Sequence, residues 1–359
     1  FRGVRIMAYS DIKDPSAHFQ TMLWTGNASS NEITFDGNSD LQADLIWHKE
    51  PNDSNGWHQT DTSIGIANYL ASESTAAEYG VGSAYVSAIG SNSITYGSGD
   101  SSFNSNSVAQ ATWAWKANGG TTASNTDGTI TTTTQVNSDA GFSIVTWAGG
   151  GTGSLGHGLG EVPDMWIVKN RDYAVSWAVG FSVSGTLGGT SNYLSLNTDG
   201  ATSTYNNIWG SSPVNSSTIT MAGDRSVNIS GNDYVAYFFK SKQGYSKFGK
   251  YVGNGSQNGP MVHTGFKPAF VIMKRSSGTG AWHLFDNKRS GYNYANDVLQ
   301  PQDTAAELSG QTYQFVDFLS NGFKVRRATH GPNVSGSTYI YMAFAENPFV
   351  AGGVPTTAI

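Results

Sequence analysis

One short pattern is written three times along the chain, and it constrains the fold more than any other feature of the sequence. In each copy an apolar, strand-like run ends in a lysine, and a tryptophan follows that lysine eight residues later. The pairs are Lys49 with Trp57, Lys169 with Trp177, and Lys274 with Trp282. Similarity at a constant spacing is the sequence signature of a repeat architecture. We therefore expect three copies of one structural unit.

Further landmarks recur around this pattern in constant order. Each copy closes on its most apolar run, and the closing aromatics align as Trp115, Phe239 and Phe344. Between tryptophan and closing run, each copy also carries a dipeptide ending in leucine, at 69–70, 193–194 and 298–299. In copies one and three this dipeptide leads into near-identical segments, 73–78 and 302–307. Either a single helical turn or a polar loop fits these segments, which are too short to form a stable helix alone.

The landmarks predict an all-β fold. Every one is strand-like, no segment shows helical apolar periodicity over three turns, and turn signals recur at the spacing typical of all-β domains. The central runs, such as 270–273 and 235–239, are apolar throughout, which indicates strands covered on both faces. We expect three tandem β-sandwich repeats of about 100 residues, of a jelly-roll or lectin-like kind.

The spacing of the repeats divides the chain. We expect an N-terminal connection from upstream sequence (1–16), repeat 1 (17–118), a linker or edge strand (119–138), repeat 2 (139–242), repeat 3 (243–350) and a C-terminal tail (351–359). A strand-like run at 4–9 falls in the first of these. The opening residues lack an initiator methionine and a signal-peptide pattern, which suggests a processed product or part of a longer chain.

Composition excludes several classes of partner and cofactor. The net charge of −6 and pI near 5.6 argue against nucleic acid, whose phosphates require clustered Lys and Arg. The chain has no cysteine, so disulfides and thiolate metal sites are excluded. No apolar run approaches the ~20 residues that span a bilayer, so we expect no membrane insertion. No cofactor and no metal site are expected.

The repeated residues favour structural roles over chemical ones. A lysine at a strand end is expected to keep its ammonium in water while its stem covers the core or shields a sheet edge. The tryptophans are more typical of core positions than of sugar-stacking platforms. We assign nine residues as repeat-defining and structural: Lys49, Trp57, Trp115, Lys169, Trp177, Phe239, Lys274, Trp282 and Phe344.

Ligand recognition is expected in the loops that differ between copies, chiefly 209–217 and 283–296. The candidate ligand-binding residues are Trp209, Tyr205, His283, Tyr292 and Tyr294. For catalysis, the chain has neither a Gly-x-Ser-x-Gly elbow nor a cysteine nucleophile. Glu161 and Asp164 are the closest carboxylate pair for acid–base work on a glycoside, and glycosidases require two such groups across a cleft. We expect no catalytic residues and no enzyme.

The repeat also resembles a known family. Copy three carries the clearest motifs, at 251–255, 263–275, 317–324 and 336–346, and copy two matches nearly as well. Copy one lacks the His-x-Gly-Phe-x-Pro lead-in that starts at His263 in copy three. Over residues 17–350 the chain is similar to a poorly characterised tandem β-sandwich repeat of tailed-phage virion proteins, especially in phages of marine bacteria and cyanobacteria. The resemblance implies a tail-fibre or capsid-decoration role, sometimes described as lectin-like.

Together these observations predict a non-enzymatic virion structural protein on the surface of an extracellular particle. It is expected to be a homo-oligomer, with other virion proteins and host-surface glycans as partners. The alternatives are a capsid decoration (cement) protein, a cellular secreted adhesin or filament subunit, and a glycan depolymerase.

Overall fold

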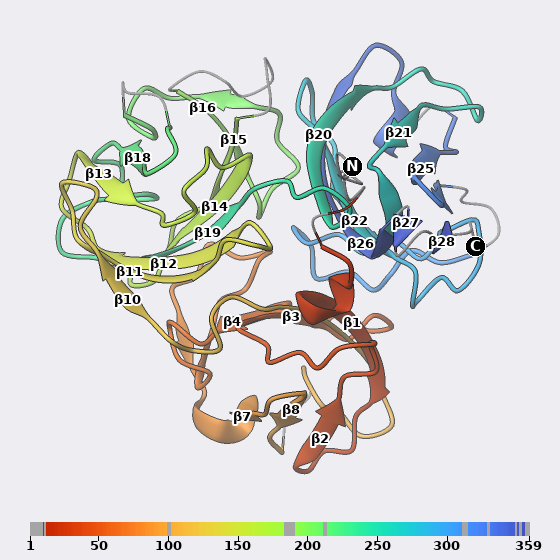
Figure 1. Ribbon diagram of the computed structural model, residues 1–359, viewed down its shortest axis with the longest axis horizontal. Helices are drawn as coiled ribbons and strands as arrows, with labels where there is room; N and C mark the ends of the chain where they lie inside the picture. Colours follow the sequence, from red (N-terminus) through yellow and green to blue (C-terminus); the bar gives the residue numbers. More distant parts are fainter. Residues whose placement is uncertain are drawn as a thin grey trace, which may run out of the picture.

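The computed structural model describes residues 10, 12–98, 102–182, 191–210, 214–310, 315–328, 331–348, 350–351 and 354–355. Three lobes surround a common centre (Figure 1). They contain the three sequence repeats and are called units 1, 2 and 3 in chain order. The regular secondary structure of the described residues is β-strand, apart from three 3₁₀ turns, η1 (Pro15–Ala17), η2 (Gly82–Ala84) and η3 (Gly331–Asn333). The all-β prediction is confirmed, whereas the strand predicted at 4–9 lies outside the described residues.

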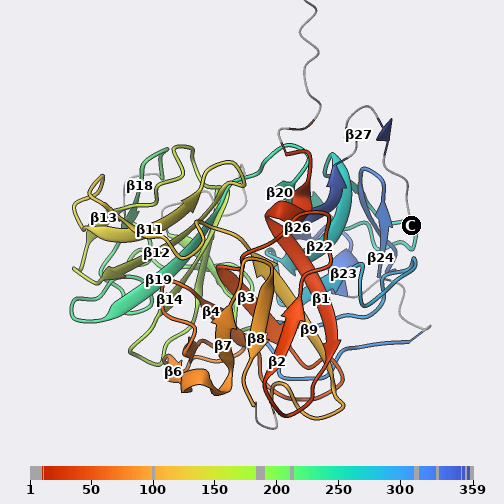
Figure 2. The ribbon, with the colours of Figure 1, turned by 60° about the horizontal axis from the view of Figure 1, so that its bottom comes forward.

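Unit 1 is a two-layer sandwich. Its large sheet has the order β1 (Phe19–Thr25), β9 (Ala109–Trp115), β3 (Leu45–Lys49), β4 (His58–Asp61). Its small sheet has the order β2 (Asn31–Thr34), β8 (Ser93–Tyr96), β7 (Val86–Ile89). A short ribbon pairs β5 (Asn68–Tyr69) with β6 (Tyr79–Gly80). Figure 2 shows these strands in front, with units 2 and 3 behind them.

Unit 3 repeats this plan. Its large sheet has the order β20 (Ser246–Val252), β26 (Thr338–Pro348), β22 (Phe266–Arg275), β23 (Trp282–Asp286). Its small sheet has the order β21 (Met261–His263), β25 (Gly322–Val325), β24 (Val316–Leu319). After the last long strand, β27 (Val350–Ala351) pairs with β28 (Val354–Pro355). In units 1 and 3 alike, a separate apolar cluster fills the space between the two layers.

Unit 2 has a wider large sheet. Its order is β10 (Ala123–Asn125), β11 (Thr132–Asn137), β12 (Phe142–Ala148), β19 (Asp233–Phe239), β14 (Met165–Asn170), β15 (Ala178–Phe181), β16 (Asn192–Ser195), β17 (Ser203–Thr204). The second layer pairs β13 (Gly153–Gly156) with β18 (Thr218–Met221). The segment 119–138, predicted as a linker or edge strand, supplies β10 and β11. Strand β11 lies inside the sheet, and β10 is the edge.

Strand register reproduces the spacing of the repeat. The residue four places before each repeated lysine pairs with the closing aromatic: Leu45 with Trp115, Met165 with Phe239, and Phe270 with Phe344. The opening strands agree less well, because Phe19 and Phe142 pair with the closing aromatic of their units but in unit 3 Ser246 does so. Aligning the copies on Phe248 therefore misplaces the first strand of unit 3 by two residues.

The three units share one core. Side chains from the inner faces of all three large sheets form a single buried cluster. Near its middle the ring of Phe344 lies 5.2 Å from Phe19 of unit 1 and 6.1 Å from Phe239 of unit 2, measured between centroids. The large sheets are thus covered on the inside by each other and on the outside by the small sheets. This confirms the expectation from the uninterrupted apolar strands.

Candidate functional site

The repeated lysines are buried at the boundaries between units. Lys49, Lys169 and Lys274 are each 0 % exposed, so the expectation that their ammonium groups stay in water is wrong. Each ammonium donates to backbone carbonyls: Lys49 to Asp53 (2.6 Å) and Glu50 (2.9 Å), Lys169 to Val175 (3.0 Å) and Thr75 (3.1 Å), and Lys274 to Gly200 (2.7 Å), Arg275 (2.9 Å) and Asp199 (3.2 Å). Burial lowers the pKa of each lysine to about 8. For Lys169 and Lys274, acceptors belong to the preceding unit.

The repeated tryptophans join the same boundaries. Their indole N–H groups donate across to a neighbouring unit at 3.0 Å: Trp57 to the Asp303 carbonyl, Trp177 to the Ala71 carbonyl and Trp282 to the Ser195 carbonyl. All three side chains are at most 1 % exposed and belong to the central core. Buried indoles offer no face for sugar stacking. Each unit therefore donates one indole hydrogen bond to the unit before it around the ring.

A backbone hydrogen bond repeats in the opposite direction. The acceptor is always the carbonyl two residues after the repeated lysine: Glu78 N–H donates to Arg171 (2.7 Å), Thr202 N–H to Ser276 (3.0 Å) and Glu307 N–H to Pro51 (2.7 Å). The near-identical segments 73–78 and 302–307 supply two of these donors, and both are loops rather than helical turns. They act as arms that reach the next unit. Because unit 3 reaches back to unit 1, the ring is closed.

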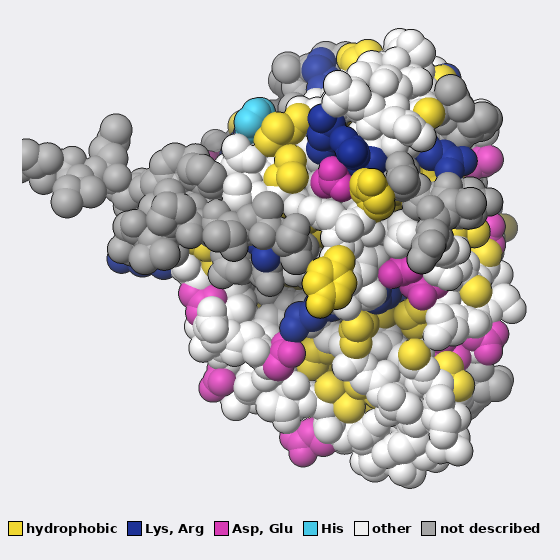
Figure 3. Space-filling view, turned by 90° about the vertical axis from the view of Figure 1, so that its right-hand side faces the viewer, with side chains coloured by type: hydrophobic (Ala, Val, Ile, Leu, Met, Phe, Trp, Pro, Cys, Tyr) yellow, Lys and Arg dark blue, Asp and Glu magenta, His cyan; other side chains and the backbone are white. Residues whose placement is uncertain are grey.

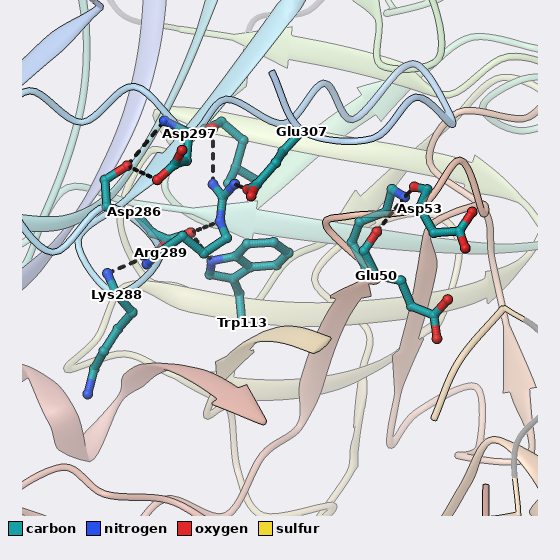
Figure 4. A network of polar contacts seen from close by, with 11 residues as sticks. Glu50, Asp53, Trp113, Asp286, Lys288, Arg289, Asp297 and Glu307 are labelled. Carbon is teal, nitrogen blue, oxygen red and sulfur yellow. Dashed lines mark hydrogen bonds and ion pairs between the residues drawn. The ribbon is translucent and has the colours of Figure 1, made fainter. Parts of the chain in front are cut away.

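Ion pairs reinforce two of the three boundaries. Between units 1 and 2, Arg171 holds Glu78 with two hydrogen bonds of 2.6 and 3.0 Å. In unit 3, Arg289 bonds Asp286 at 2.6 Å and Glu307 at 2.8 Å, above the indole of Trp113 from unit 1 (Figure 4). The Trp113 indole N–H donates to Asp286 at 3.2 Å. The Arg289 side chain is 4 % exposed, so this network is shielded from solvent.

The position of Asp286 has a counterpart in each unit. Asp61 of unit 1 occupies it and accepts a 2.7 Å hydrogen bond from the Tyr237 hydroxyl of unit 2. Burial raises the pKa of Asp61 to about 6, with its hydrogen bonds opposing the shift. Unit 2 has Phe181 there, so its boundary with unit 3 is apolar at this point. Sequence reasoning missed these partners, although each lies 12 residues after the repeated lysine, a spacing visible in the sequence.

Two of the five predicted ligand residues, Trp209 and His283, are buried. Trp209 is 5 % exposed, donates its indole N–H to the Asn192 carbonyl at 2.9 Å and packs edge-on against Trp166 at 5.5 Å. The indole is thus bonded to strand β16 and is covered by neighbouring side chains. His283 lies in strand β23 rather than in a loop and is 6 % exposed. Burial lowers the pKa of His283 to about 4, as for a neutral core imidazole.

The other three candidates are exposed but lie on different units. Tyr292 and Tyr294 of unit 3 are 84 % and 39 % exposed, and the guanidinium carbon of Arg326 lies 5.7 Å from the Tyr294 ring. Figure 3 shows the side of the molecule that unit 3 occupies, where hydrophobic side chains lie scattered among basic, acidic and uncharged ones. Tyr205 of unit 2 is 49 % exposed and lines a pocket with Tyr193 and Asp224. The structure does not bring the five residues into one site.

Glu161 and Asp164, the closest carboxylate pair for acid–base chemistry in the sequence, are engaged in salt bridges. Lys242 bonds Glu161 at 2.6 Å, and Lys240 bonds Asp164 at 3.2 Å. Both lysines belong to the short connection between units 2 and 3, so the pair helps to hold that connection. Among the described residues, no three His, Asp or Glu side chains are grouped to hold a metal ion. Within the same residues, no helix is long and apolar enough to cross a membrane.

Fold and boundaries together define a class: a closed ring of three β-sandwich units built from one chain. The chain belongs to the family described as Domain of unknown function (DUF7483), which matches residues 14–348. The match spans all three units, in agreement with their shared core. No curated protein and no solved structure matches the chain.

Proposed function

We propose that this chain is a non-enzymatic structural protein of a tailed-phage virion, displayed as a fibre or appendage that adheres to host-surface glycans. The observation that carries the proposal is the closed ring, in which each unit is tied to both neighbours and all three share one core. Such a body keeps its loops in a fixed relation under mechanical load, because no unit can swing on a linker. A particle-borne adhesin needs that property.

The surface composition supports the same role. Charged residues make up 13 % of the chain, and much of the exposed loop sequence is Gly, Ser, Thr and Asn. Exposed tyrosines such as Tyr205 and Tyr292 add aromatic faces, which pair well with the apolar face of a sugar ring. Many weak glycan contacts on one particle produce tight attachment by avidity. We propose other virion proteins and further copies of this chain as its structural partners.

Two measurements on particles test the proposal. Immunogold labelling of purified, DNA-containing particles is expected to place the protein on their exterior. Purified protein is expected to bind host cells and to slow particle adsorption, with cells stripped of surface polysaccharide as the control. If the protein binds neither cells nor envelope glycans, and shells lacking it fall apart, a cement role replaces adhesion. Absence from purified particles would favour a cellular secreted adhesin or filament subunit.

An incubation with host polysaccharide separates adhesion from degradation. We expect no oligosaccharide release after prolonged incubation, because Glu161 and Asp164 are engaged by lysines. Release of oligosaccharides would instead make the chain a glycan depolymerase.

A further inference from the structure

One side chain makes unit 2 different from its two sister units. The residue nine places after the repeated lysine is His58 in unit 1 and His283 in unit 3, but Ala178 in unit 2. Strand register confirms the equivalence, since each pairs with the residue just before the lysine. A methyl group therefore occupies the position at which the other two units carry an imidazole ring.

The imidazoles fill their sites. The His58 ring lies 4.4 Å from Tyr69, 5.2 Å from Tyr85 and 5.0 Å from Phe103, measured between centroids. In unit 3 the buried His283 ring lies 6.2 Å from Phe315. Both histidines act as packing residues between the layers of their sandwiches.

In unit 2 a pocket borders this position, with the nearly buried Ala178 (1 % exposed) in its wall. The pocket has a volume of ≈ 300 Å³, at the small end of the range for ligand sites. It is lined by Ser176, Trp177, Ala178, Tyr193, Ser195, Tyr205, Ile208, Asp224 and Ser226. The rim is accessible, because Tyr205 is about half exposed and Asp224 is partly exposed.

The lining combines aromatic faces with hydroxyls and one carboxylate. The Oδ1 atom of Asp224 accepts hydrogen bonds from the backbone and side chain of Ser226, which fixes the orientation of the carboxylate. Tyr193 and Asp224 line the same pocket. Burial raises the pKa of Tyr193, and the charge of Asp224 adds to the shift. A fixed carboxylate accepts strong hydrogen bonds from hydroxyl groups and repels anions. A tyrosine ring beside it offers an apolar face.

We propose that this pocket binds one neutral hexose or N-acetylhexosamine residue of a glycan. Tyr205 covers the apolar face of the sugar ring, and Asp224 accepts hydrogen bonds from its hydroxyls. The inference rests on the proposed function, because it assigns the glycan contact to one unit. It also explains why a ring of three similar units carries this site once: the sister units keep a histidine in the same place.

The chain itself supplies the test substitution. Ala178→His places in unit 2 the side chain that units 1 and 3 already hold at that position, so the fold is expected to accept it. Saturation-transfer NMR on the full chain would use glucose, galactose, mannose, N-acetylglucosamine and N-acetylgalactosamine as probes. We expect transfer to at least one of them, affinity at least tenfold weaker in Ala178→His, and affinity about tenfold weaker in Tyr205→Ala.

The same NMR measurement is made on a control variant. Tyr79→Ala removes a tyrosine of similar exposure from unit 1 and is expected to leave sugar binding unchanged. No transfer to any neutral sugar, transfer to choline or N-acetylneuraminic acid alone, or unchanged affinity in a folded Ala178→His protein would each overturn the assignment. If Ala178→His unfolds, Tyr205→Ala and Asp224→Asn decide the question, because both side chains are partly exposed.

Host-cell binding separates this inference from the proposed function. If Ala178→His protein binds cells as well as the unaltered chain, adhesion stands and the pocket is not its site. If the unaltered chain binds no cells but its sugar binding depends on Ala178, the pocket stands and host adhesion falls.

Discussion

A buried lysine whose ammonium is held by backbone carbonyls is costly, and this chain carries three of them at equivalent positions. The Lys169 ammonium is held by the carbonyls of Val175 and Thr75, the second of which belongs to unit 1. A neutral side chain of similar length would fit the same space but would leave both carbonyls without this donor. Buried, unpaired acceptors cost about 1–3 kcal/mol each. At the residue scale, the lysine thus ties two units through their backbones.

Lys169→Met is therefore expected to lower the free energy of unfolding by about 1–3 kcal/mol at pH 7, measured by urea denaturation. Lys247→Met is the matched control, because Lys247 is exposed on strand β20 and its loss is expected to change stability by less than about 0.5 kcal/mol. Equal stabilities of the two variants would mean that the carbonyl contacts contribute nothing.

The lowered lysine pKa values predict the direction of pH dependence. A lysine with a pKa of about 8 in the folded state and 10.5 when unfolded binds fewer protons folded than unfolded between these values. Stability is expected to rise with pH in that window, by up to about 1.4 kcal/mol per pH unit for each lysine. Urea denaturation at pH 7.5 and 9.0 tests this below the range in which the tyrosines of the unfolded chain ionise appreciably, and Lys169→Met should flatten the slope by about a third. A stability that falls over this range would contradict the lysine burial.

At the scale of elements, the boundaries differ in how well solvent reaches their ion pairs. Arg289 is 4 % exposed and holds two carboxylates over Trp113, whereas the side chains of Arg171 and Glu78 are 20 % and 15 % exposed. Removing one partner from a buried pair leaves an uncompensated charge, which costs about 3–5 kcal/mol. At the partly exposed Arg171–Glu78 pair the loss is smaller, because water screens the charge that is left behind. The arms that carry Glu78 and Glu307 are therefore expected to contribute unequally to stability, despite their similar sequences.

Arg289→Met is expected to destabilise the chain by about 3–5 kcal/mol, and Arg171→Met by about 1 kcal/mol, in urea denaturation at pH 7. Arg289→Met leaves the buried Asp286 carboxylate without its arginine partner. The double variant Arg289→Met/Asp286→Asn removes that charge and should recover part of the lost stability. A larger loss of stability in Arg171→Met than in Arg289→Met would contradict this ranking of the two ion pairs.

Local spacing was enough to predict the strands but not what surrounds them. The eight-residue interval from lysine to tryptophan reflects a two-strand unit in which Lys274 pairs with Trp282, so it is visible within one copy. Burial of the lysines depends on carbonyls 94 residues away for Lys169, and 74 and 75 away for Lys274, in neighbouring units. The pocket depends on Ala178. Its importance becomes visible only when the strand register shows that His58 and His283 occupy the same position in units 1 and 3.

At the scale of the whole molecule, the shared core predicts one unfolding event for a chain of 359 residues. Chains of this length usually unfold in domain-sized steps. Here the inner face of each large sheet is buried only against the other two, so loss of one unit exposes the core of all three. Calorimetry is expected to show a single transition in which the calorimetric and van't Hoff enthalpies agree.

Phe344→Ala tests that coupling directly. Its ring lies 1 % exposed among rings from all three units, and replacing a buried phenylalanine by alanine costs about 3–5 kcal/mol. We expect the single transition to move to lower temperature without splitting. Phe323→Ala, in the outer apolar cluster of unit 3, is the control. If the three units unfold together, this substitution must also move the single transition of the whole chain to lower temperature. If Phe323→Ala instead produces a separate early transition, unit 3 unfolds on its own and the ring is not one cooperative body.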